Sequence, residues 1–153
     1  MARPSESYAG APRRGRVAEL FLAALLLDHK FEVYEPLVDV AIDLIAYNPQ
    51  GHLLRIQSKQ RNPDTGTIHQ VQLPRDSHAR LPTHIYLHRG GIPPVEWWLL
   101  PFDVFKDLAL HPRSNAKGRE LIRLNLSATT RKALLSFERE HGIEAALKWS
   151  AGD

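Results

Sequence analysis

One acidic and two polar side chains interrupt neighbouring stretches of sequence that otherwise resemble buried strands. Asp43 lies within the apolar, β-branched run VDVAIDLIAY, residues 38–47, and Gln57 and Lys59 follow the apolar start of LLRIQSKQRN. A carboxylate in a buried strand costs several kcal/mol unless it is paired or binds a metal. These residues are therefore candidates for a cation site, although an ion pair between Asp43 and Arg55 or Lys59 explains them equally well.

The turn between the two stretches predicts how they pair. The sequence NPQG, residues 48–51, suits a three-residue loop, because Pro favours an early turn position and Gly tolerates the left-handed conformation. Such a loop pairs Asp43 with Gln57, whereas a four-residue loop would pair it with Ile56. Since residues two apart on a strand share a face, Lys59 would join them. A polar edge strand that faces water is the alternative.

The remaining pattern predicts an α/β domain with a central mixed sheet flanked by helices. We expect helices over residues 17–29, 101–111, 128–141 and 143–149, and strands over residues 31–36, 38–47, 52–59, 83–88, 96–100 and 120–126. Ser127 is the expected N-cap of the third helix and Gly142 its stop, and residues 62–82 are expected to form a long loop. The run 38–47, apolar on both faces, is expected to be the central strand.

Length and composition restrict the class of protein. The 153 residues fit one domain, expected over residues 15–150 after a flexible basic tail of residues 1–14. The chain has no cysteine, which excludes disulfides and thiolate zinc sites and suits a cytoplasmic protein. No apolar run approaches the roughly 20 residues that span a bilayer, and no secretory signal is visible. The net charge of +3 weakly favours a polyanionic partner.

Glu19 in the first helix, Pro36, Asp43 and the Gln57-Ser58-Lys59 triplet after a hairpin together resemble the PD-(D/E)xK nuclease superfamily. The resemblance covers the helix, strand and hairpin of residues 16–60. It is nearest in pattern to the Holliday-junction-resolvase-like and intron-homing-endonuclease-like branches, in which a helical Glu precedes the core and Gln can replace the acid before x-Lys. It implies a restriction-endonuclease-like core.

The resemblance also implies Mg²⁺- or Mn²⁺-dependent cleavage of DNA. Asp43 would be the main metal ligand, with the Gln57 amide oxygen and the Ser58 main-chain carbonyl beside it. Glu19 would bind the metal directly or through water. Lys59 would lie near the attacking water or the scissile phosphate.

A single active site per chain and the presence of Gln57 in place of an acid lead to expectations about the oligomeric state and about alternative functions. Cutting two strands favours a homodimer or a higher symmetric assembly, and the apolar segment EWWLLPFDVF is a candidate interface. Because Gln57 removes one negative charge, a catalytically inactive nucleic-acid-binding or scaffold protein is the alternative function. An unrelated α/β protein, with Glu19 a first-turn acid favoured by the helix dipole, is a third interpretation.

Overall fold

The computed structural model describes residues 6–37, 42–61, 68–72, 81–90, 93–114 and 120–151. The first half of the chain forms α1 (Glu6–Asp28), β1 (Glu32–Tyr34), β2 (Leu44–Tyr47), β3 (Leu53–Arg61), β4 (Ile68–Gln72) and β5 (His84–Arg89). The second half forms β6 (Glu96–Pro101), α2 (Phe102–Leu108), β7 (Leu110–Ser114), β8 (Glu120–Asn125), α3 (Ala128–Ala133), the 3₁₀ turn η3 (Leu135–Phe137) and α4 (Glu140–Lys148).

A five-stranded mixed sheet, in the order β1-β2-β3-β5-β6, confirms the predicted α/β class. β1, β2 and β3 form an antiparallel meander, β5 runs parallel to β3, and β6 returns antiparallel to β5. The prediction that residues 38–47 form the central strand is wrong, because β3 is the central strand and β2 covers only Leu44–Tyr47. Residues 38–41 lie outside the described residues.

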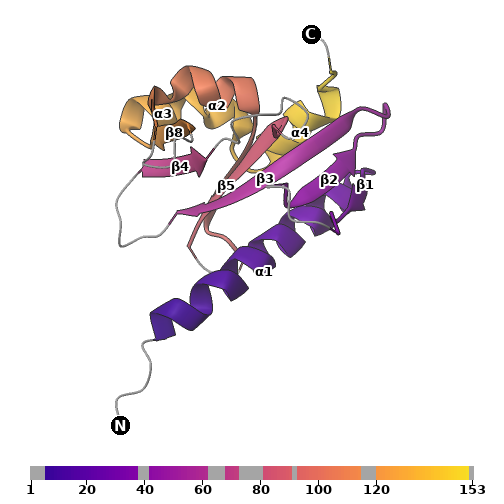
Figure 1. The fold of residues 1–153 in the computed structure, drawn as a ribbon. Coiled ribbons are helices and arrows are strands. Elements are labelled where there is room, and N and C mark those ends of the chain that lie inside the picture. The colour runs from indigo at the N-terminus through magenta and orange to yellow at the C-terminus, as the bar shows by residue number, and fades with distance from the viewer. Residues whose placement is uncertain are drawn as a thin grey trace.

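The sheet has a hydrophobic core on each face (Figure 1). Helices α1 and α4 contribute to the first core, which contains Ala18, Leu22, Leu26, Leu44, Ala46, Leu54, Ile56, Tyr86, Trp97, Leu99, Ile143 and Ala146. The second core lies on the opposite face and contains Ile85, Leu87, Trp98, Leu100, Phe102, Phe105, Ile122, Leu124, Leu126 and Leu134. Adjacent strand residues point to opposite faces, which is why Trp97 and Trp98 separate into different cores.

Helix α1 packs against the sheet through residues spaced four apart. Ala18, Leu22 and Leu26 are buried, as expected for one face of an amphipathic helix. The helix already begins at Glu6, so residues 6–14 of the expected flexible tail are helical, and the first turns extend past the strands in Figure 1. Pro12 lies inside this helix, although proline is normally disfavoured in a helix interior because it lacks the N–H that bonds to the preceding turn.

Three other expectations fail in the region after β3. The expected loop of residues 62–82 contains β4, which joins a second sheet in the order β4-β8-β7. The helix expected over residues 101–111 ends at Leu108, and β7 follows it. The segment expected to form an oligomer interface is buried in the two cores instead, at Trp97, Trp98, Leu99, Leu100, Phe102 and Phe105.

No helix in the described ranges combines the length and apolarity needed to cross a membrane.

The C-terminal helices divide at a different place from the one predicted. Ser127 caps α3 as expected, since its hydroxyl accepts the Thr130 N–H at 3.2 Å. However, α3 ends at Ala133, and Gly142 lies inside α4 rather than stopping a helix. A Cβ at Gly142 would lie 2.6 Å from the Phe137 carbonyl oxygen and 2.8 Å from that of Leu99. Gly142 is therefore required for close packing of α4 against β6.

We predict that Gly142→Ala destabilises the fold by about 1–3 kcal/mol, because backbone atoms must move to admit the methyl group. Gly15→Ala is the matched control, since a Cβ there would lie 3.9 Å from Gln60 Oε1, an ordinary van der Waals contact. Replacing a helical glycine by alanine without a clash is neutral or stabilising by about 0.5–1 kcal/mol. Chemical denaturation of both variants checks this, and a Gly142→Ala protein as stable as wild type would contradict it.

Candidate active site

The β2–β3 hairpin has the predicted register. Leu44 pairs with Ile56, and the Asn48 N–H donates to the His52 carbonyl at 3.0 Å, which leaves a three-residue loop. Gly51 has φ +85°, the conformation for which glycine was expected. The regular pairs end at Leu44 and Ile56, and the Asp43 N–H also donates to the Ile56 carbonyl, so the predicted pairing of Asp43 with Gln57 is not part of the ladder.

Asp43 is bonded to β3 through both its main chain and its side chain. Its N–H donates to the Ile56 carbonyl at 2.9 Å, and its Oδ2 accepts the Ser58 N–H at 2.7 Å. The half-buried carboxylate therefore lies near the plane of the sheet, where β2 ends. Because the N–H and C=O of one residue leave an extended strand on the same side, the Ser58 carbonyl also points toward this edge.

Glu19 approaches Asp43 from helix α1. Its side chain is only 19% exposed, and Arg16 Nη1 lies 3.5 Å from its Oε2. Burial raises the Glu19 pKa above its ordinary value, and the negative charge of Asp43 raises it further. The interpretation of Glu19 as an exposed first-turn acid is wrong, because α1 begins at Glu6 and places Glu19 in its interior.

Gln57 and Lys59 project from the face of β3 opposite α1. Their partners on β5 are Ile85 and Leu87, which belong to the second core, whereas α1 packs on the first. Gln57 is 5% exposed and Lys59 is half-buried. Glu19 and these two side chains thus flank β3 from opposite faces, with Asp43 near the plane between them. That Gln57 and Lys59 share one pocket with Asp43 stays a prediction.

Two residues of β5 complete the surroundings of the site and were not singled out as functional from sequence. His88 Nε2 lies 2.9 Å from Ser58 Oγ, and the Tyr86 hydroxyl donates to the Ala18 carbonyl at 3.1 Å. Burial lowers the pKa of His88 to about 4, so its ring is uncharged at neutral pH. The alternation in THIYLH places the two side chains on one face, but no pattern indicates that α1 covers that face.

Arg16 links the helix to the segment after β1. Its guanidinium lies 2.6 Å from Glu35 Oε1 as well as 3.5 Å from Glu19 Oε2. The side chains of Arg16 and Glu35 are each about half exposed, so this pair contributes little to stability. It partly offsets the negative charge at Glu19, whose pKa Arg16 lowers while Asp43 and burial raise it.

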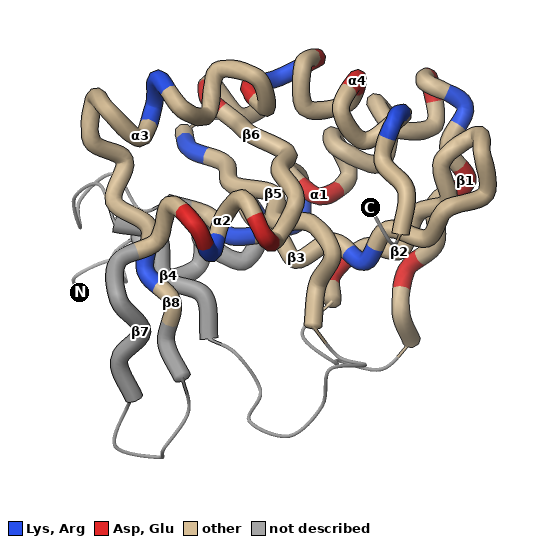
Figure 2. Tube along the Cα trace, turned by 90° about the horizontal axis from the view of Figure 1, so that it is seen from above, with Lys and Arg blue, Asp and Glu red and all other residues tan. Residues whose placement is uncertain are grey.

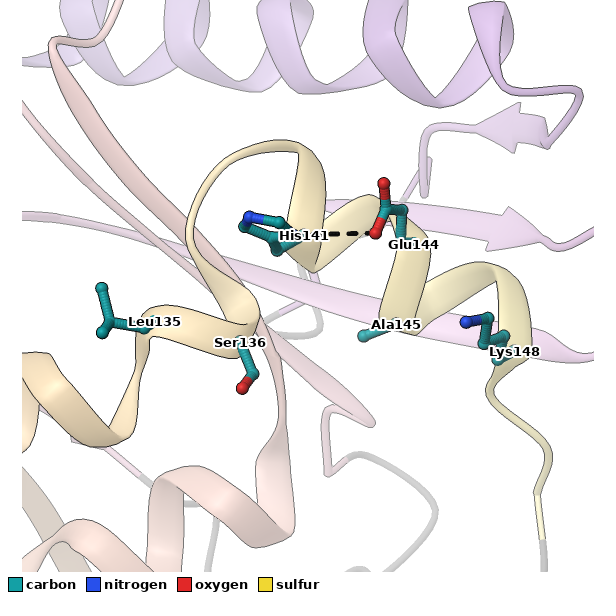
Figure 3. A pocket seen from close by; sticks show the side chains of 6 residues that line it. All are labelled: Leu135, Ser136, His141, Glu144, Ala145 and Lys148. Atoms are coloured by element: carbon teal, nitrogen blue, oxygen red, sulfur yellow. Dashed lines mark ion pairs between the residues drawn. The ribbon is translucent and has the colours of Figure 1, made fainter.

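A separate surface hollow of about 490 Å³ lies over η3 and α4 (Figure 3). Its lining is Leu135, Ser136, His141, Glu144, Ala145 and Lys148. Figure 3 shows that these side chains come from the C-terminal segment, where His141 Nδ1 and Glu144 Oε2 are 3.6 Å apart. No predicted site residue lines it, and the chemistry expected from sequence lies at the β2–β3 edge instead.

Charge alone does not mark a binding face. Within the described ranges, segments of both charges are scattered over the molecule, and α2 carries both signs (Figure 2). The same ranges hold no group of three or more His, Cys, Asp or Glu side chains arranged for a metal ion. A cation at the β2–β3 edge would therefore depend on the carboxylates of Asp43 and Glu19, supplemented by neutral oxygen donors.

Comparison with known proteins supports the fold. No protein-family model matches the chain, and no curated protein matches it. The solved structure of a bacterial homing endonuclease, I-Ssp6803I, is similar with a TM-score of 0.57 and 16% sequence identity. The similarity covers 90% of this chain and 91% of that one. At this identity it shows a shared, nuclease-like α/β fold, and membership of the PD-(D/E)xK superfamily stays a prediction.

We predict that Asp43→Asn lowers the Glu19 pKa, because it removes the neighbouring negative charge while leaving Glu19 buried. The folded-state pKa is raised, so Glu19 favours folding below its ordinary pKa of about 4.5, and this contribution is lost as the pH rises through the folded value. Titration of the Glu19 side-chain carboxyl by ¹³C NMR measures the change.

Asp103→Asn is the matched control for this titration. Asp103 lies on the surface of α2, with an 87% exposed side chain paired to Lys106 at 3.0 Å. The control should leave the Glu19 titration unchanged. An unaltered Glu19 pKa in Asp43→Asn would show that the two carboxylates do not interact.

Proposed function

We propose that this protein is a metal-dependent endonuclease that hydrolyses DNA phosphodiester bonds. The observation that carries the proposal is the Asp43 carboxylate, held at the start of β2 by the Ser58 N–H at 2.7 Å and within the electrostatic influence of Glu19 on α1. Asp43 is bonded there to the main chain of the Gln57-Ser58-Lys59 triplet. The likeness in fold to a homing endonuclease supports the same chemistry.

The oxygen donors at this edge fit a hard divalent cation such as Mg²⁺ or Mn²⁺. Two carboxylates, an amide oxygen and a main-chain carbonyl are the donors that such ions prefer. Burial raises the Glu19 pKa and the negative charge of Asp43 raises it further, and a bound cation would favour the ionised form of both carboxyls. We assign Asp43, Glu19, Gln57 and the Ser58 carbonyl as ligands. The bound ion would stabilise charge on the phosphate and lower the pKa of a bound water.

The protein's own residues would orient the reacting groups. The Ser58 N–H fixes the Asp43 carboxylate at 2.7 Å, so that its position relative to β3 is set before a cation binds. Lys59 carries a positive charge on the same strand face as Gln57, where its ammonium would donate to the scissile phosphate or to the attacking water. β3, which carries Gln57, Ser58 and Lys59, is paired on both sides by neighbouring strands, and this fixes the backbone of the triplet.

We also propose that the protein acts on duplex DNA as a homodimer or a higher symmetric assembly in the cytoplasm. One site per chain cuts one strand at a time, so two copies related by symmetry would cut both. The interface must lie outside the buried segment EWWLLPFDVF. Light scattering coupled to size-exclusion chromatography measures the assembly.

A DNA-binding protein without catalysis is the alternative, and one residue favours it. Gln57 stands where the nuclease motif carries an acid, so the site has one negative charge fewer for a cation. Its amide can still offer an oxygen, but it attracts Mg²⁺ less strongly than a carboxylate does.

We predict that Asp43→Ala and Lys59→Ala each lower the rate of Mg²⁺-dependent cleavage of plasmid and branched DNA by roughly 100-fold or more. DNA binding in Ca²⁺ should persist in both variants, and circular dichroism checks that each remains folded, since Asp43→Ala leaves the Ser58 N–H without its acceptor. Asp103→Ala and Lys106→Ala, an exposed acid and lysine on α2, are the matched controls and should cut normally. Failure of wild type to cut with Mg²⁺ or Mn²⁺ would favour the binding-only alternative.

We predict that Gln57→Glu strengthens Mg²⁺ binding about tenfold, since one added charge near a cation is worth on the order of 1 kcal/mol or more. Gln50→Glu, in the exposed hairpin turn, is the matched control. Calorimetric titration with Mg²⁺ compares the two. Equal affinities in both variants would place the metal away from Gln57.

A further inference from the structure

We propose that Tyr86 is a positioning residue that fixes the separation between the Glu19 and Asp43 carboxylates. It would do so by joining helix α1 to strand β3 through one side chain of β5. The consequence for metal binding rests on the proposed function, whereas the effect on Glu19 does not.

Tyr86 tethers the helix beside Glu19. It is fully buried, and its hydroxyl donates to the Ala18 carbonyl at 3.1 Å. That carbonyl lies inside α1, where the helical bond from the residue four positions later already satisfies it. The helix therefore does not need the extra bond. Because neighbouring helix residues rise only about 1.5 Å, holding Ala18 also holds the backbone of Glu19.

The same side chain reaches the group that holds Asp43. Tyr86 and Ser58 are partners in the β3–β5 register, so they lie on one face of the sheet. The Tyr86 ring packs on His88 with centroids 4.9 Å apart, and His88 Nε2 lies 2.9 Å from Ser58 Oγ. The Ser58 N–H holds the Asp43 carboxylate at 2.7 Å. Asp43 is thus held by Ser58, and the helix residue next to Glu19 is held by Tyr86, the partner of Ser58 on β5.

The tether opposes a repulsion that would otherwise separate the acids. Glu19 and Asp43 carry like charges, and each destabilises the ionised form of a close neighbour. Glu19 has an alternative partner in Arg16, toward which its side chain could turn. Burial and the charge of Glu19 both raise the pKa of Tyr86, so its hydroxyl keeps the proton that it donates. Fixed in this way, the carboxylates remain available to one cation.

Tyr86→Phe tests the proposal because it removes the hydroxyl and keeps the ring. We expect the Glu19 pKa of the metal-free protein, measured by ¹³C NMR, to fall toward its ordinary value as the side chain moves into water. We expect calorimetry to show Mn²⁺ binding weakened about fivefold to tenfold, the range that one hydrogen bond supplies. Tyr34→Phe is the control, since that exposed hydroxyl donates to Glu32 Oε2, at 3.0 Å.

A second variant, Ser58→Ala, breaks the contact with His88 Nε2 but keeps the N–H that holds Asp43. It should weaken Mn²⁺ binding in the same direction, by a smaller factor. A folded Tyr86→Phe protein with the wild-type Glu19 pKa and Mn²⁺ affinity would overturn the proposal. If Tyr86→Phe does not fold, wild-type values in Ser58→Ala would overturn it. Absence of Mn²⁺ binding by wild type would refute the proposed function, and the separation of the Glu19 and Asp43 carboxylates in a crystal structure of Tyr86→Phe would still decide the role of Tyr86.

Discussion

The hydrogen bond from the Ser58 N–H to the Asp43 carboxylate is the interaction on which the candidate site depends. A main-chain donor on a central strand is among the most rigid partners that a carboxylate can have, and its 2.7 Å length is typical of a bond strengthened by charge. It occurs where β2 ends and no longer supplies a regular ladder partner to β3. A half-buried carboxylate without such a donor would be costly. The Asp43 carboxylate is thus held in a fixed position at the start of β2.

This arrangement also creates an unfavourable interaction that the fold has to tolerate. Glu19 lies largely out of water and within the electrostatic influence of Asp43, so its ionised form is destabilised. Arg16 offsets part of this, but it is half exposed and shared with Glu35. Like charges brought together at the expense of stability are typical of sites that bind cations or perform acid–base chemistry. Structural ion pairs, by contrast, usually join opposite charges, as Arg131 and Glu96 do here at 3.0 Å.

The rest of the molecule explains why these groups can be held so closely. β3 is paired on both sides, and each face of the sheet has its own apolar core. Glu19 belongs to a helix anchored on the first core by Ala18, Leu22 and Leu26. Gln57 and Lys59 project toward the second core. A site built from regular elements supported on both faces has little freedom to move, which favours binding of a small ion over adaptation to varied ligands.

The sequence by itself determined the hairpin, its register and the α/β class. Those features depend on local chemistry: the turn residues Pro49 and Gly51, and the alternation of apolar and polar residues along β3. Helix boundaries were less well determined, because packing decided them. α1 continues through Pro12, and Gly142 lies inside α4 since close approach to Leu99 and Phe137 requires it.

Only the tertiary structure placed Tyr86 against Ala18 of α1 and brought His88 to Ser58. No local pattern specifies which face of a sheet a distant helix will cover. That choice minimises exposed apolar surface over the whole chain, and it joins residues far apart in sequence, such as Ala18 and Tyr86.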